Sequence, residues 1–269
     1  LCQRPLTGEN LGNVLTFVGQ SFALSLLIFL ALTLVIGAVL MFVINLLNID
    51  KPFKFFDEEK ALEYATNGKN TYTAIKEEKD LSDFVVPTEY EGLDIIPSTS
   101  LMSAIEFDLF PKWQREFVLR KCLEPIRARG YYDYILIDCS PSLGLITVNC
   151  LTAADSVIIP VQAEYYALEG ISKLLVTIKI IKSRLNPDLE IEGFLLTMYD
   201  ARLRLARQVY DEVKQHFQDM VFETIIQRNI RLSESPSHGV PVLLYDADST
   251  GARNYLQLAE EIIKKNSVN

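Results

Sequence analysis

The sequence predicts an α/β fold with a mainly parallel, doubly wound sheet, preceded by an apolar N-terminal segment. Signals for strands and helices alternate from residue 92 onward at the spacing of βαβ units, whose strands pair in parallel. The apolar run at residues 132–137 ends in a carboxylate, Asp138, which suits the carboxyl end of a buried strand. At 269 residues, with 49% hydrophobic side chains, the chain can form one large domain of this class.

The individual elements follow from apolar runs that turn residues separate. Short runs of apolar and β-branched residues predict strands at residues 92–97, 132–140, 156–161 and 191–200. Longer stretches with helical periodicity predict helices at residues 113–130, 167–185, 205–217 and 251–265. Serine, proline and glycine at residues 233–242 predict a loop before the last helix.

Residues 1–50 are predicted to be an apolar N-terminal segment, because no charged residue lies between Glu9 and Asp50. As a helix, residues 22–47 would be roughly 39 Å long, enough to cross a hydrocarbon layer of about 30 Å. They are therefore a candidate transmembrane helix. Three lysines follow and favour a cytoplasmic location for the rest of the chain: Lys51, Lys54 and Lys60.

The same apolar run also fits the buried first strand, helix and second strand of an α/β domain, which are equally apolar. The membrane interpretation is preferred because no proline or charged residue interrupts residues 22–47. Residues 51–80 are polar and are interpreted as a helical connector. The α/β domain itself is expected at residues 81–269.

The formal net charge of −9 argues against a protein coated all over by nucleic acid, since that needs clustered lysine and arginine. Local cationic clusters remain, one of Arg202 with Arg204 and Arg207, the other of Arg228 with Arg231. Arginines of this kind can contact phosphates. From the residues alone, ordinary surface ion pairs are the preferred interpretation.

Asp138 allows two interpretations. A carboxylate at the end of a buried strand is well placed to hold magnesium or to orient a water molecule. It can equally cap the turn that follows at residues 139–144. Patterns over a longer stretch of sequence favour the first interpretation.

A resemblance to a known family rests on three stretches, in order along the chain: residues 133–175, 195–202 (LLTMYDAR) and 221–262. They resemble the ParA/Soj (MinD-like) family of partitioning ATPases, and residues 133–175 are similar to its Walker B region. Upstream, residues 71–98 and 115–126 resemble the segment that these proteins carry after their second strand. The resemblance extends from there to the end of the chain.

The resemblance implies a P-loop NTPase fold of the deviant Walker A group, with ATP and magnesium as cofactors, in a homodimer. It implies ATP-dependent, nonspecific DNA binding in chromosome or plasmid partitioning, with a ParB-like partner, in the cytoplasm at the nucleoid. Asp138 matches the catalytic acid of the magnesium and water network, so it is expected to hold magnesium through water. Arg202 and Arg231 match DNA contacts of the family, and Arg228 joins them as a neighbouring candidate.

Two family motifs are missing, the glycine-rich phosphate loop and an acidic DxDPQ motif whose expected position precedes Thr71. The loop KGGxGKT, whose main-chain N–H groups cradle phosphates, has no counterpart in residues 1–71. Residues 67–71 (NGKNT) lack the preceding strand and the second glycine, and are interpreted as a turn. We therefore expect ATP turnover to be impaired. The alternative function is a non-catalytic adaptor for DNA or protein with a ParA-like fold, anchored at the inner face of the plasma membrane by residues 22–47.

Overall fold

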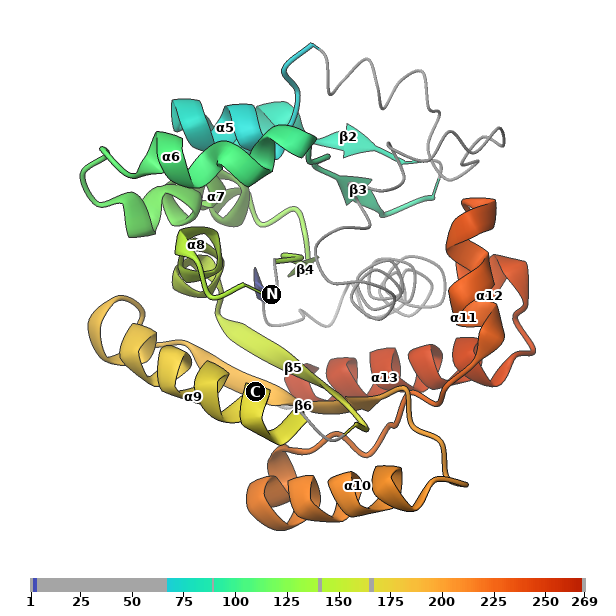
Figure 1. Ribbon diagram of the computed structural model, residues 1–269. Helices are drawn as coiled ribbons and strands as arrows, with labels where there is room; N and C mark the ends of the chain where they lie inside the picture. The colour runs from blue at the N-terminus through green and yellow to red at the C-terminus, as the bar shows by residue number, and fades with distance from the viewer. Residues whose placement is uncertain (1, 4–66, 89, 140–141, 165–166, 268–269) are drawn as a thin grey trace.

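A computed structural model of the chain describes residues 2–3, 67–88, 90–139, 142–164 and 167–267 (Figure 1). The apolar run at residues 22–47 lies outside these ranges, so the membrane helix stays a prediction. Within the described ranges, none of the helices is both long enough and apolar enough to cross a membrane.

Two parallel strands lie at the centre of the fold. β5 (Ser156–Gln162) pairs with β6 (Glu190–Thr197), with Ile159 opposite Phe194. A third segment runs parallel to β6 on its other side, through bridges from Phe194 to Val221 and from Tyr199 to Gln227. β5 reads SVIIPVQ, the apolar and β-branched composition of a strand that is buried on both faces.

Helices cover both faces of this sheet. Ile159, Phe194 and Leu196 share one core cluster with side chains of α8 (Leu145–Ala153), α9 (Ala167–Arg184) and α10 (Arg204–Phe217). Ile158 and Leu195 share another with side chains of α11 (Ile230–Glu234), α12 (Val242–Tyr245) and α13 (Thr250–Ser267). Successive strand residues thus alternate between the two faces. The predicted doubly wound α/β fold is confirmed.

A further group of helices is joined to the sheet through α8. The short helices α5 (Thr71–Glu77) and α6 (Ile105–Leu109) share a core with α7 (Val118–Arg129) and α8, and the four lie together in Figure 1. The buried side chain of Asn149 in α8 ties it to the start of α7. Its Oδ1 accepts from the N–H of Leu119 at 3.1 Å, and its Nδ2 donates to the carbonyl of Arg115 at 2.8 Å.

Two strands predicted from the sequence are much shorter than expected. Residues 92–97 contribute only β3 (Asp94–Ile95), which pairs antiparallel with β2 (Val86–Pro87) in a local hairpin. Pro97 offers no N–H, which limits the pairing at the end of the hairpin away from its turn. Residues 132–140 contribute β4 (Tyr134–Ile135), which pairs antiparallel with β1 (Cys2–Gln3).

The prediction of a loop at residues 233–242 is wrong, because this stretch is largely helical. α11 begins after Asn229, whose Oδ1 accepts from the N–H of Arg231 at 2.8 Å. A 3-10 turn at Ser235–His238 follows directly and ends at Gly239, which has φ 62°. The other described 3-10 turns are Leu81–Phe84, Ser100–Ala104, Arg115–Phe117 and Gln218–Met220. The predicted helices correspond to α7, α9, α10 and α13.

Candidate functional site

Asp138 lies three residues beyond β4, in the loop between that strand and α8. Solvent still reaches its side chain, yet the protein around it displaces enough water to raise the pKa of the carboxyl to about 6. Among the described residues no hydrogen bond or ion pair holds this carboxylate. A cap on the following turn would require such a bond, so the described contacts do not support that interpretation.

A nearby cation stabilises the ionised form of an unpaired and partly desolvated carboxylate. Carboxylate oxygen is a ligand that magnesium prefers, directly or through water. The oxygen donors of Asp138 and the lack of a competing partner among the described residues therefore fit magnesium.

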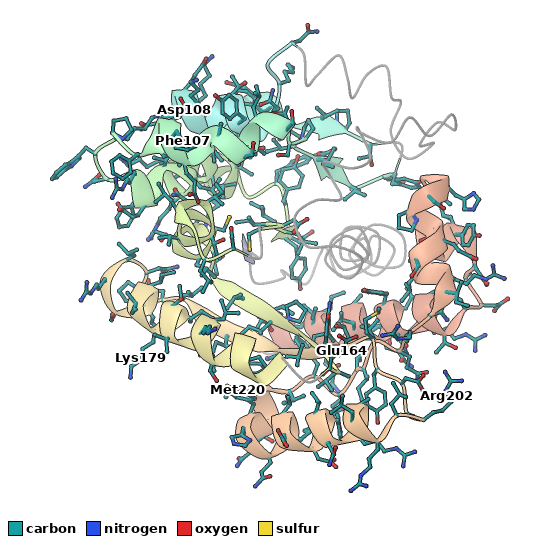
Figure 2. All side chains as sticks on the ribbon, in the orientation of Figure 1. Phe107, Asp108, Glu164, Lys179, Arg202 and Met220 are labelled. Atoms are coloured by element: carbon teal, nitrogen blue, oxygen red, sulfur yellow. The ribbon has the colours of Figure 1, made fainter. Side chains whose placement is uncertain are left out.

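Arg202 is held at the surface by Asp200. Its Nε donates to Asp200 Oδ1 at 2.9 Å and its Nη2 donates to Oδ2 at 2.6 Å, which is the two-point geometry of a guanidinium on a carboxylate. The arginine side chain is 87% exposed, whereas that of Asp200 is only 13% exposed. These hydrogen bonds lower the pKa of Asp200 to about 2, and the charge of Arg228 contributes to the shift. The guanidinium therefore points outward from a fixed acid (Figure 2).

Arg228 lies beside the segment that carries Arg202. Its main-chain N–H donates to the carbonyl of Tyr199 at 2.9 Å, next to the parallel bridge between Tyr199 and Gln227. Its guanidinium contacts Glu164, which follows β5, at 3.3 Å. Parallel strands end at one edge of a sheet, and ligands bind beyond that edge in this fold class. The structure thus brings Arg202 and Arg228 together at the carboxyl edge.

Arg231 lies in α11, a few residues further along, between two carboxylates. Its Nη1 is 2.8 Å from Glu234 Oε2, and its Nε is 3.1 Å from Asp246 Oδ2. The guanidinium carbon is 6.0 Å from the centre of the Tyr245 ring. Arg231 is half exposed. Its pKa is raised, and the main cause is the hydrogen bond to Glu234.

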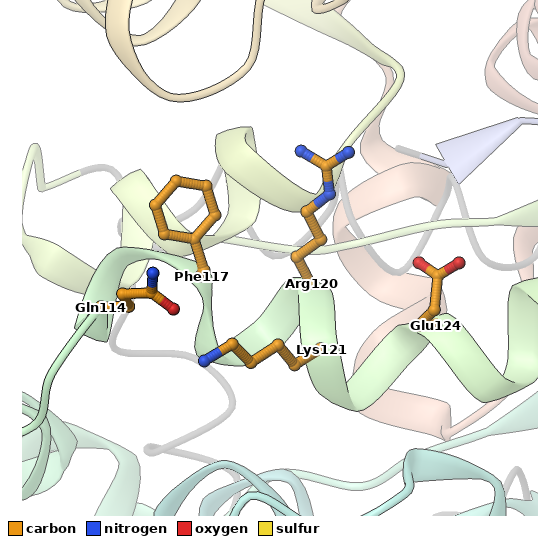
Figure 3. Close-up of a pocket in the computed structure, with 5 residues that line it drawn as sticks. All are labelled: Gln114, Phe117, Arg120, Lys121 and Glu124. Carbon is orange, nitrogen blue, oxygen red and sulfur yellow. The ribbon is translucent and has the colours of Figure 1, made fainter.

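A surface pocket lies on a different part of the molecule. It has a volume of about 440 Å³, and its lining side chains come from α7 and the turn before it (Figure 3): Gln114, Phe117, Arg120, Lys121 and Glu124. None of the candidate site residues lines it. We assign it no role in the site.

The sequence interpretation missed the acids that pair with the arginines. Glu234 lies three residues from Arg231 on the same helix, and this spacing was a usable signal. Asp200 lies two residues from Arg202 in a turn, a spacing that does not predict a pair. Glu164 and Asp246 reach their arginines only through the tertiary fold. No sequence signal was available for those two.

Comparisons with known proteins find a matching family and several relatives. A model of the AAA domain family matches residues 49–191. The chain is 52% identical over 191 residues to the sporulation initiation inhibitor protein Soj of Bacillus subtilis, covering 71% of this chain and 75% of that protein. It is 49% identical over 196 residues to the chromosome partitioning protein ParA of Myxococcus xanthus, covering 73% of this chain and 69% of that protein.

A solved structure matches as well. Cobyrinic acid a,c-diamide synthase from Mycobacterium smegmatis, with bound ADP and magnesium, has a TM-score of 0.58 and 30% sequence identity. The match covers 71% of this chain and 69% of the synthase.

Proposed function

The chain belongs to the ParA/Soj family of partitioning ATPases, and we propose that it partitions chromosomes or plasmids by binding DNA of any sequence through Arg202, Arg228 and Arg231. The observation that carries the proposal is the position of these arginines. Arg202 and Arg228 follow neighbouring parallel segments at one edge of the sheet, and Arg231 opens the helix that comes next. Each side chain is at least half exposed.

This arrangement suits the DNA backbone rather than the bases. Guanidinium groups form two-point hydrogen bonds with phosphate oxygens, and such contacts carry no sequence information. Because the protein as a whole is acidic, with a formal net charge of −9, DNA contacts have to come from local exposed arginines of this kind. Nonspecific binding of moderate affinity is the expected result.

We further propose ATP and magnesium as cofactors. Support comes from the related synthase that holds ADP and magnesium, and from the unpaired carboxylate of Asp138. Asp138 would hold the metal through water, and the metal would neutralise charge on the phosphates when bound. A homodimer, a ParB-like partner and action in the cytoplasm at the nucleoid are proposed with it, from membership of the family.

The test measures binding of the full chain to two short fluorescent duplexes of unrelated sequence, by anisotropy, with and without ATP and magnesium. We expect equal affinity for both duplexes and a loss of affinity as salt is raised. A clear preference for one duplex, or no binding at low salt, would overturn the DNA proposal. Tighter binding with ATP and magnesium supports the cofactor proposal, and identical binding contradicts it.

A further inference from the structure

Arg231 and Arg202 meet their acids in different ways. Arg202 faces a single carboxylate, from Asp200, and this acid is largely buried behind it. Arg231 instead has Glu234 on its Nη1 and Asp246 on its Nε. The Arg231 guanidinium and its two carboxylates together carry a formal charge of about −1. This net charge repels a phosphate at distances within the screening length.

The two acids around Arg231 are not equally fixed. Glu234 is three residues away on the same helix, and its Oε2 also accepts from the hydroxyl of Tyr245 at 3.2 Å. Asp246 comes from the loop after α12, and Arg231 is its only ion-pair partner among the described residues. An exposed pair of this kind contributes about 1 kcal/mol or less. Asp246 is therefore the acid that an incoming phosphate can displace.

We propose that Asp246 limits the DNA affinity of this surface by competing with phosphate for the guanidinium of Arg231. The inference rests on the proposed DNA binding. When a phosphate binds, the Nε of Arg231 exchanges the carboxylate of Asp246 for a phosphate oxygen, and Glu234 continues to hold Nη1. The exchange keeps binding weak enough to reverse.

The test is the change of Asp246 to Asn in the full chain. Asp246→Asn removes the competing charge and should raise affinity for a short duplex about two- to fivefold at low salt. Asp246→Ser, a second variant that removes the charge, should give the same gain. In an Arg231→Ala background the Asp246→Asn change should have no effect on DNA affinity, because the guanidinium for which Asp246 and phosphate compete is gone.

The chain offers a matched control two residues away. Asp248 is 99% exposed and pairs with Arg253 at 3.3 Å. Asp248→Asn makes the same change in net charge and should leave DNA affinity within experimental error. An equal gain in Asp248→Asn, a gain that persists without Arg231, or no gain in either Asp246 variant overturns the inference. If the wild-type chain and the Asp246 variants all fail to bind DNA, the proposed function itself has failed.

Discussion

The main-chain N–H of Arg228 donates to the carbonyl oxygen of Tyr199 at 2.9 Å. This hydrogen bond joins two segments that are about thirty residues apart in sequence and makes them neighbours at the carboxyl edge of the sheet. Asp200 lies next to this junction, and both Arg202 and Arg228 lower the pKa of its carboxyl. Arg202 and Arg228, two of the three predicted DNA contacts, thus lie close together.

The first prediction concerns Arg228, the candidate with the weakest support from sequence. Arg228→Ala should lower affinity equally for duplexes of any sequence and make the logarithmic salt dependence shallower by about 0.9, the value for one phosphate contact on duplex DNA. Arg129→Ala is the control, because Arg129, the last residue of α7, is 61% exposed and is also paired with an acid, Asp80. Equal losses in the two variants would remove Arg228 from the DNA surface.

The second prediction concerns the pH dependence of folding stability at Asp138. Its carboxyl has a pKa of about 6 in the folded protein, against about 3.9 when unfolded. The folded state therefore binds more protons between about pH 4 and pH 6, and this group lowers stability as pH rises through that window. Above about pH 6 the cost is fully present.

Asp138→Asn removes that cost, so its melting temperature relative to wild type should be higher at pH 7 than at pH 4. Thermal unfolding followed by circular dichroism at both values measures the difference. The fully exposed Asp248→Asn serves as a control for general charge effects. A difference between Asp138→Asn and wild type that does not change with pH would contradict the raised pKa.

The third prediction compares two glycines. A methyl group at Gly193 in β6 would lie 2.6 Å from the ring of Phe222 and 3.0 Å from the carbonyl of Met220. Gly193→Ala should therefore destabilise the fold by about 1–3 kcal/mol. At Gly170 in α9 the added carbon would meet no heavy atom within 4 Å beyond its own helix backbone and chain neighbours, so Gly170→Ala should stabilise by about 0.5–1 kcal/mol. Urea unfolding of both variants tests the pair, and the reverse order would show that the helix and sheet packing is misassigned.

Much of the fold could be predicted because local patterns and tertiary packing agree. The apolar strand at residues 156–161 and the periodic stretch at residues 205–217 appear as β5 and α10 with nearly the predicted bounds. The strand at residues 132–140 was overestimated, because apolar residues such as Leu136 and Ile137 indicate burial but not pairing. The helical structure at residues 233–238 was missed, because serine and proline indicate loops but also begin helical turns.

The site was predicted less completely than the fold. The resemblance supplied Asp138, Arg202 and Arg231, but it gave no information on what neutralises the arginines. Pairs that depend on distant segments, such as Arg228 with Glu164, arise only when the sheet brings strand ends together. The apolar run at residues 22–47 lies outside the described residues, so its interpretation as a membrane helix stays a prediction.

The most direct test of the account compares the wild-type chain with a variant in which Arg202, Arg228 and Arg231 are all alanine, by measuring duplex DNA affinity across a series of salt concentrations. The account predicts that the variant folds with an unchanged circular dichroism spectrum and loses most of its affinity. The slope against the logarithm of salt should become shallower by about 2.7, the value for three phosphate contacts. A folded triple variant with wild-type affinity and slope would contradict the account.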